Sequence, residues 1–178
     1  MTKIFTTMKG FETIDPTRIS DNFIDAIANQ WMLVTAGTAD DCNTMTASWG
    51  GVGELWGGHV AFVFIRPQRH THIYTEREER MTLSFFDRRY RQALAYCGSH
   101  SGRNEPKIAN AGLSVTTTDD GVPAIAQARL ILQCRKLYAD TIRPEAFVDP
   151  SFCEKMYPEK DFHTVYVVRI EKAYIANQ

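Results

Sequence analysis

The sequence predicts a mainly β fold, an antiparallel barrel interrupted by short helices. Apolar and β-branched stretches outnumber helical patterns, and they fall at residues 31–38, 44–49, 59–65, 81–86, 126–138 and 164–175. The helical patterns between them are short and unevenly spaced, whereas a doubly wound parallel sheet requires regular alternation of strands and helices. An antiparallel barrel with helical insertions therefore accounts for the pattern better.

Length and composition restrict the class of protein. The 178 residues fall within the usual size of one domain, so we expect residues 1–178 to form a single domain. Ten Phe, seven Tyr and three Trp exclude disorder as the dominant state, because this many aromatic residues can build a core. The net charge of −1 lacks the positive excess that is typical of a nucleic-acid-binding protein.

The cysteines and the apolar runs indicate the compartment. Four cysteines are scattered without a C-x-x-C pair, which is typical of a reducing compartment and predicts no zinc site. The first residues lack an apolar stretch of signal-peptide length, and the run from Val60 to Ile65 is too short to span a bilayer. We therefore expect a cytoplasmic protein that binds neither membrane nor nucleic acid and holds no metal.

An arm and a helix are expected over residues 1–30. The helix covers residues 20–30, where apolar residues repeat at helical spacing and Ser20 can act as the N-cap. Strands 31–38 and 44–49 follow this helix. This N-terminal segment therefore leads directly into the predicted sheet.

The middle of the sheet is predicted around one very apolar strand. Gly50, Gly51 and Gly53 predict a turn after the second strand. Strand 59–65 is apolar on both faces, which is typical of a buried central strand, and Pro67 ends it.

Short helices and two long strands are expected in the remainder of the chain. The helices cover residues 71–77, 88–97 and 106–112, and the last of them begins with a proline, which a first helical turn tolerates. The long strands cover residues 126–138 and 164–175, and both alternate. The first is expected to have a polar face that carries Gln127, Arg129, Gln133 and Arg135, and the second has Tyr166, Val168 and Ile170 on one side. Residues 143–160, between these strands, form an insertion of unknown role, in which Ser151 and Glu154 predict a capping box.

The segment after the apolar strand suits a phosphate. Arg66, Gln68, Arg69, His70 and Thr71 converge at a predicted helix N-terminus. Free N–H groups and a partial positive charge at such a helix end favour an anion, and arginine adds charge-assisted hydrogen bonds. The alternative is a solvated turn whose arginines pair with glutamates of the segment 76–79.

A second segment, residues 43–49, carries small polar side chains beside an indole. Thr44, Thr46 and Ser48 alternate with Met45 and Ala47 along the predicted strand, which Asn43 precedes and Trp49 follows. A row of small donors and acceptors beside an indole can read the polar edge of a flat heterocycle. An ordinary strand with a solvated polar face is the alternative.

Two further segments contribute candidates. Small residues including Ser99 and Ser101 follow a predicted helix and let a ligand approach the backbone, and Arg103 and Lys107 add positive charge. A surface loop is the alternative. The last strand is entered through His163, and most single histidines at strand starts are structural. No nucleophile elbow, P-loop, dinucleotide fingerprint or zinc-protease motif is present.

Together the four segments resemble the flavin reductase-like family, which includes flavoredoxin and small NAD(P)H:flavin oxidoreductases. The motifs N-x-M-T-x-S-W, R-P-x-R-x-T, S-G-R-x-x-x-K and D-x-H occur in this order, at residues 43–49, 66–71, 101–107 and 161–163. The resemblance implies an FMN-binding split β-barrel of antiparallel, Greek-key type. It also implies a homodimer that binds FMN non-covalently near the subunit interface.

The same resemblance implies roles for individual residues. The isoalloxazine ring would be bordered by Asn43, Thr46, Ser48 and Trp49. The phosphate and ribityl chain would be held by Arg66, Arg69, His70 and Thr71. The same site would be lined by Ser99, Ser101 and Arg103, with Lys107 near the ring. The cofactor-binding set is completed by Met45, Ala47 and Gln68. No catalytic acid or base is assigned, and His163 is the one candidate.

The function implied is an FMN-binding oxidoreductase, an NAD(P)H-dependent flavin reductase. NADH or NADPH would donate hydride to FMN, and a second flavin or a protein would accept the electrons. One alternative is an electron carrier of flavoredoxin type without a pyridine nucleotide site. A flavin-binding module without turnover and a barrel that has lost its cofactor are the others.

Overall fold

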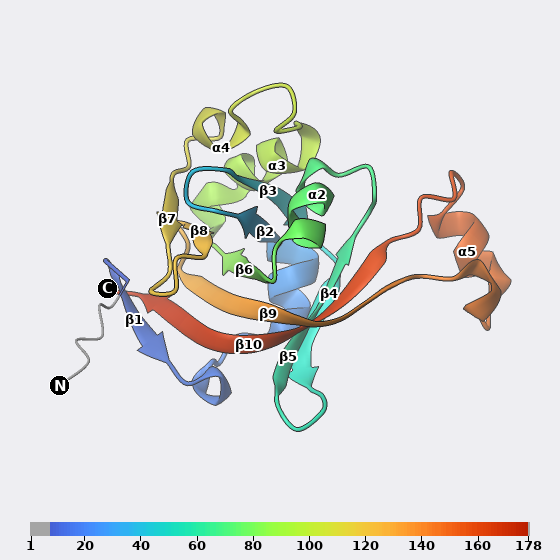
Figure 1. The fold of residues 1–178 in the computed structure, drawn as a ribbon, viewed down its shortest axis with the longest axis horizontal. Helices are drawn as coiled ribbons and strands as arrows, with labels where there is room; N and C mark the ends of the chain where they lie inside the picture. The colour runs from blue at the N-terminus through green and yellow to red at the C-terminus, as the bar shows by residue number, and fades with distance from the viewer. Residues whose placement is uncertain (1–7, 178) are drawn as a thin grey trace.

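A computed structural model describes residues 8–177, and antiparallel strands dominate it (Figure 1). The strands are β1 (Phe11–Ile14), β2 (Met32–Gly37), β3 (Cys42–Ala47), β4 (Gly50–Glu54), β5 (His59–Ile65), β6 (Arg80–Phe85), β7 (Val115–Thr117), β8 (Pro123–Ile125), β9 (Leu130–Thr141) and β10 (Thr164–Ala176). The six predicted strands are all present, so the expected mainly antiparallel β fold with short helices is confirmed.

The helical elements are short and lie between strands. They are α1 (Phe23–Asp25), α2 (His70–Arg77), α3 (Arg91–Ser99), α4 (Lys107–Asn110), α5 (Pro150–Met156), the π-helical turn η2 (Ala26–Gln30) and the 3₁₀ turns η1 (Pro16–Arg18), η3 (Arg88–Tyr90) and η4 (Pro144–Ala146). Within the described part of the chain, no helix combines the length and the apolar character needed to span a bilayer.

The order of strands in the large sheet explains how it curls. The sheet runs β3-β2-β6-β9-β10-β5-β4, and β1 pairs with β10 beside this path. Its two end strands, β3 and β4, are consecutive in the chain, and only Ser48 and Trp49 separate them. The chain itself therefore brings the two edges of the sheet together at one corner.

The glycines after β3 form a strand, so the predicted turn is wrong. Gly51 pairs with Phe62 across the β4–β5 ladder. Gly50 has φ 147°, and a Cβ there would lie 2.7 Å from the Phe62 carbonyl oxygen. Glycine is therefore required at position 50 for the chain to turn this corner and pair with β5. The run of glycines in the sequence does not distinguish such a strand from a turn.

Both faces of the central sheet are buried. Met32 and Leu132 belong to a core cluster on one face, whereas Leu33 and Ile131 belong to a second cluster that includes residues of α3 and β8. The strand predicted over residues 126–138 was expected to have one polar face. That expectation is wrong for the first half of β9, because the α3 side of the sheet is covered and Gln133 is fully buried there.

Two predicted helix starts differ from the structure. Asn22 caps α1, because its side-chain oxygen accepts hydrogen bonds from the next turn, and Ser20 does not cap it. Asp149 caps α5 by accepting from the Ser151 N–H, so the predicted Ser151–Glu154 capping box is wrong. In both cases the Asx residue directly before the first helical residue supplies the acceptor.

The insertion projects from the rest of the molecule as an arm. Figure 1 shows α5 extending away from the sheet, between the end of β9 and the start of β10. No residue of α5 is buried, and Val148 and Phe152 expose apolar side chains. The base of the arm, by contrast, packs against the protein through Tyr157, which is buried.

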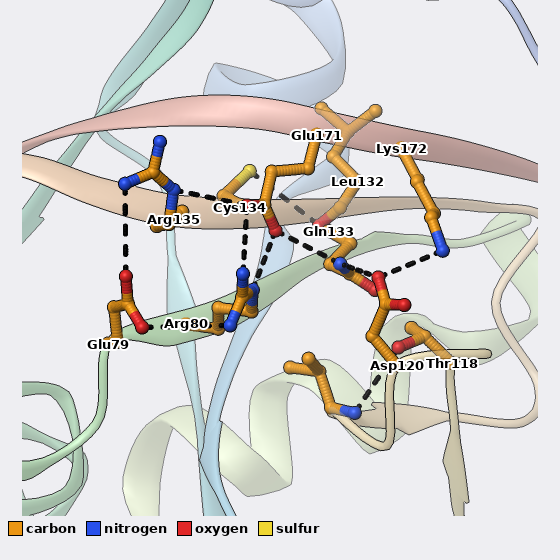
Figure 2. Close-up of polar contacts among 11 residues, drawn as sticks. Glu79, Arg80, Thr118, Asp120, Leu132, Gln133, Cys134, Arg135, Glu171 and Lys172 are labelled. Carbon is orange, nitrogen blue, oxygen red and sulfur yellow. Dashed lines mark hydrogen bonds and ion pairs between the residues drawn. The ribbon is translucent and has the colours of Figure 1, made fainter.

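A network of paired charges crosses β6, β9 and β10 (Figure 2). Glu171 accepts hydrogen bonds from Arg80 Nε at 2.7 Å and from Arg135 Nε at 3.1 Å. Asp120 accepts from Gln133 Nε2 at 2.7 Å and forms an ion pair with Lys172 at 2.9 Å. Each cation of this charge network therefore has a carboxylate partner.

Candidate functional site

Most of the predicted site residues surround two cavities that share Arg69. The first, the strand cavity, has a volume of about 290 Å³ and is lined by residues 45–49, Phe64, Arg66, Arg69 and His163. The second, the basic cavity, has a volume of about 180 Å³ and is lined by residues 98–101, Gln68, Arg69, His70, Arg103 and Lys107. Four segments that are distant in sequence thus meet at one place.

The topology explains why these segments meet. The strand cavity lies where β3 passes into β4, which is also where the two sheet edges approach. Thr164 of β10 pairs with Ile65 of β5, and this register brings His163 beside Arg66. Residues of α2 and α3 then meet at the basic cavity, where Arg69 Nη1 donates to the Gly98 carbonyl oxygen at 3.1 Å.

The strand cavity is bordered by aromatic rings. The Trp49 side chain is 46% exposed, and its ring centroid lies 5.3 Å from that of His163. Phe64 contacts the same imidazole edge-on. The predicted row of hydroxyls is only partly available, because Thr44 and Thr46 bond to Val34 and to the backbone of Leu94.

Arg66, which was expected to help hold the phosphate and ribityl chain, is paired within the protein. It lines the strand cavity, its Nη1 forms an ion pair with Asp161, and its Nη2 donates to the Met156 carbonyl oxygen at 3.0 Å. Gln68 Nε2 donates to the same Asp161 carboxylate at 2.6 Å. Asp161 therefore neutralises Arg66, and the alternative in which these arginines pair with glutamates of residues 76–79 is wrong for Arg66 and Arg69.

The basic cavity contains buried nitrogen atoms without partners among the described residues. Over residues 8–177, Arg69 Nη2 and His70 Nδ1 are buried and have no hydrogen-bond partner. Burial lowers the pKa of Arg69. Burial also lowers the pKa of His70, and the positive charges of Arg103 and Lys107 lower it further. Buried polar groups in proteins are normally paired, so these two atoms at one cavity indicate a candidate binding site.

Lys107 adds a buried ammonium to the same cavity. Lys107 is 3% exposed, and its Nζ donates to the Cys97 carbonyl oxygen at 3.2 Å. Burial lowers the pKa of Lys107 to about 8. The structure places Lys107 on the basic cavity, and its expected position near the ring stays a prediction.

Asn43 and Thr71 support the site without lining either cavity. Both are buried, and Asn43 Nδ2 donates to Thr71 Oγ1 at 2.8 Å. A Cβ at Gly102 would lie 2.2 Å from Asn43 Oδ1, so glycine permits the loop to approach this pair closely. The two residues thus connect β3, the start of α2 and the loop 99–106.

Tyr157 at the base of the arm reaches the strand cavity. Its hydroxyl lies 2.8 Å from His163 Nδ1, and both residues are buried. Burial lowers the pKa of His163 to about 4, with a smaller contribution from the Arg66 charge. Sequence reasoning identified His163 but missed Tyr157, Phe64, Gly98 and His100, since no local pattern distinguishes them from core or loop residues.

Comparison with known proteins adds the family and the fold. A family model described as the flavin reductase like domain matches residues 24–178. No curated protein sequence matches the chain significantly.

Three solved structures resemble the chain. Flavoredoxin from Methanosarcina acetivorans has a TM-score of 0.64 at 19% identity, over 84% of this chain and 69% of that chain. An FMN-binding protein from Thermus thermophilus has a TM-score of 0.62 at 21% identity, over 80% of this chain and 69% of that chain. A split-barrel protein of Shewanella frigidimarina, assigned as a flavin reductase, has a TM-score of 0.67 at 13% identity, over 88% of this chain and 72% of that chain.

At identities this low, the structural similarity establishes the fold alone. The family is established by the family model. That model covers most of the chain, and it includes every segment that meets at the two cavities. The chain therefore belongs to the flavin reductase-like family, with the fold of its split-barrel relatives.

Proposed function

We propose that this chain binds FMN non-covalently, with the phosphate in the basic cavity and the ring in the strand cavity. The observation that carries the proposal is the pair of buried, unpartnered nitrogen atoms Arg69 Nη2 and His70 Nδ1. Phosphate oxygens accept charge-assisted hydrogen bonds from a guanidinium and also accept from a protonated imidazole nitrogen. The first turn of α2, which begins at His70, has no side-chain cap and can contribute N–H groups to the same anion.

The arrangement of charge favours a ligand with one anionic end and one neutral, flat end. Arg69, Arg103 and Lys107 make the basic cavity positive. In the strand cavity, Asp161 neutralises Arg66 and the pKa of His163 is lowered to about 4, so the positive charge there comes from Arg69, which both cavities share. Trp49 and Phe64 supply apolar and aromatic surface for a heterocycle. These features fit FMN, and Arg69 joins the two halves of the site.

The proposed activity is that of an NAD(P)H-dependent flavin reductase. Bound FMN supplies the hydride and electron chemistry, with NADH or NADPH as donor and a flavin or a protein as acceptor. The chain positions the ring through residues 45–49 and anchors the phosphate through Arg69. Buried cations near the flavin also favour the binding of its anionic forms. We further propose that the protein is cytoplasmic and forms a single domain.

A spectrum of the purified protein tests this function. We expect flavin absorbance after reconstitution with FMN, and bleaching when NADH or NADPH is added without oxygen. Flavin that binds but is not bleached by either nucleotide would make the chain an electron carrier of flavoredoxin type or a flavin-binding module. Failure to bind FMN at micromolar concentration would overturn the proposal entirely.

We also propose a homodimer. Support comes from large apolar side chains that remain exposed in one chain, namely Trp49, Trp56, Val148 and Phe152. Trp49 lies at the strand cavity, and the other three lie on the β4–β5 hairpin and on the arm. Light scattering should report twice the mass of one chain, and the mass of a single chain at micromolar concentration would contradict the dimer.

A further inference from the structure

The arm has no role in the function described so far, yet its base contacts a site residue. Tyr157 is 7% exposed and His163 is 6% exposed, so their hydrogen bond at 2.8 Å is shielded from water. The Tyr157 ring is held on several sides. Phe147 and Phe162 pack against it, and the Arg66 guanidinium lies 5.1 Å from its centroid.

The hydrogen bond between Tyr157 and His163 can take two forms. Either the phenol donates to Nδ1 and the imidazole proton resides on Nε2, or Nδ1–H donates to the phenol oxygen. In the second form the phenol hydrogen needs another acceptor, and among the described residues the hydroxyl makes no other hydrogen bond. The first form satisfies both groups with a single proton, so the contacts favour it.

The charged neighbours of His163 do not fix which imidazole nitrogen carries the proton, so the bond to Tyr157 determines the tautomer. Asp161 accepts from Arg66 and Gln68 through Oδ2, its Oδ1 is buried without a hydrogen-bond partner, and among the described residues no hydrogen bond joins this carboxylate to the His163 ring. Arg66 carries a positive charge beside the ring and opposes protonation of the imidazole. His163 consequently remains neutral, and Nε2 is the nitrogen left for a ligand in the strand cavity that His163 lines.

We propose that Tyr157 is a positioning residue that holds His163 in the tautomer with its proton on Nε2, so that the imidazole donates a hydrogen bond into the strand cavity. The acceptor is an uncharged carbonyl oxygen or ring nitrogen of a flat heterocycle. Identification of that heterocycle as the flavin or nicotinamide ring rests on the proposed function. The tautomer itself depends only on this chain's own contacts.

Nitrogen NMR of the flavin-free protein tests the tautomer. In ¹⁵N-labelled protein, with His163 assigned by comparison with His163→Gln, we expect an unprotonated Nδ1 and a protonated Nε2 from about pH 5 to 8. Tyr157→Phe keeps the ring packing and removes the donor. It should give a mixture of tautomers and raise the pKa of His163 by about 0.5–1 unit, since one neutral hydrogen bond is lost.

Tyr138→Phe is the matched control, because the Tyr138 hydroxyl binds the exposed Asp140 and does not contact His163. It should leave the His163 signals unchanged. A proton on Nδ1 in the unmodified protein would overturn the proposal, and this measurement decides the question even if Tyr157→Phe fails to fold. An identical tautomer and pKa in folded Tyr157→Phe would also overturn it.

Ligand titration tests the donation and separates it from the proposed function. FMN is added first and an oxidised pyridine nucleotide second, and the Nε2–H proton should shift at one of these steps. If flavin absorbance shows FMN bound and neither step shifts this proton, the donation is wrong while the proposed function stands. If FMN does not bind but the tautomer is as expected, the proposed function fails and the role of Tyr157 stands.

Discussion

The cations of the basic cavity and those of the charge network have different hydrogen-bond partners. In the network, Arg80 and Arg135 donate to Glu171, and Lys172 pairs with Asp120 (Figure 2). The cations of the basic cavity instead donate to backbone carbonyl oxygens. Arg69 donates to Gly98, Arg103 to Gln68 and Lys107 to Cys97.

This difference separates a structural cluster from a binding site. A carboxylate satisfies the N–H groups of a cation and also neutralises its charge, whereas a carbonyl oxygen does only the first. The cations of the network are therefore neutralised by carboxylates of the protein itself. The basic cavity retains its positive charge, and burial makes that charge unfavourable until an anion arrives. Three substitutions test this contrast.

Removal of the arginine shared by the two cavities should have the largest effect. Arg69→Ala deletes Nη2, a donor without a partner among the described residues, so we expect FMN binding to weaken by about 1.5–3 kcal/mol, or roughly 10- to 150-fold. Riboflavin has no phosphate and should bind almost equally to both proteins. Flavin fluorescence titrations provide the measurement.

Arg80→Ala serves as the control for Arg69→Ala, because Arg80 belongs to the charge network and does not line either cavity. It should leave both flavin affinities unchanged. Equal losses of FMN and riboflavin affinity in Arg69→Ala would show that Arg69 does not bind the phosphate.

Lys107→Met should stabilise the flavin-free protein by about 1–2 kcal/mol at neutral pH while it weakens FMN binding. Burial lowers the pKa of Lys107 from 10.5 to about 8, so the unfolded chain binds more protons between these values. The corresponding penalty of about 3 kcal/mol is present below pH 8 and is offset in part by the bond to Cys97.

The sign of this effect follows from the direction of the pKa shift. Stability of the unmodified protein should rise as the pH increases from about 8 to 10.5, and the advantage of Lys107→Met should disappear over the same interval. Urea unfolding at a series of pH values measures both. A variant that is less stable at pH 7 and binds FMN normally would remove Lys107 from the anion site.

Glu171→Gln should have the smallest effect and should act on stability alone. Its hydrogen bond from Arg80 lowers the pKa of Glu171 from 4.5, so the carboxylate stabilises the fold above that pH. The side chain is largely shielded, and we expect a loss of about 1 kcal/mol at neutral pH. This loss should diminish as the pH falls below 4.5 through the folded pKa, because the native carboxyl then becomes protonated.

FMN and riboflavin affinities should be unaffected by Glu171→Gln. A change in either affinity would mean that the charge network and the basic cavity are coupled, and the contrast between the two regions would then not hold. Thermal or urea unfolding and flavin titration on the same samples make the comparison.

The sequence by itself determined the strand pattern and the chemistry that each segment can offer. The apolar run from Val60 to Ile65 and the alternation in β10 depend on neighbours within one element, so their periodicity is visible in the chain. The motif residues around Arg69 and Arg103 could likewise be identified as cationic segments. A donor is the same chemical group wherever the chain places it.

The tertiary structure decided which of those groups are free. Arg66 and Arg69 look equivalent in sequence, yet Asp161, which lies 95 residues further along the chain, neutralises only Arg66. Tyr157 reaches His163 because the arm folds back at its base, and Lys107 loses its solvent at the basic cavity. Neutralisation and burial depend on distances between remote segments, and these distances are set by the packing of the sheet and its helices rather than by local sequence.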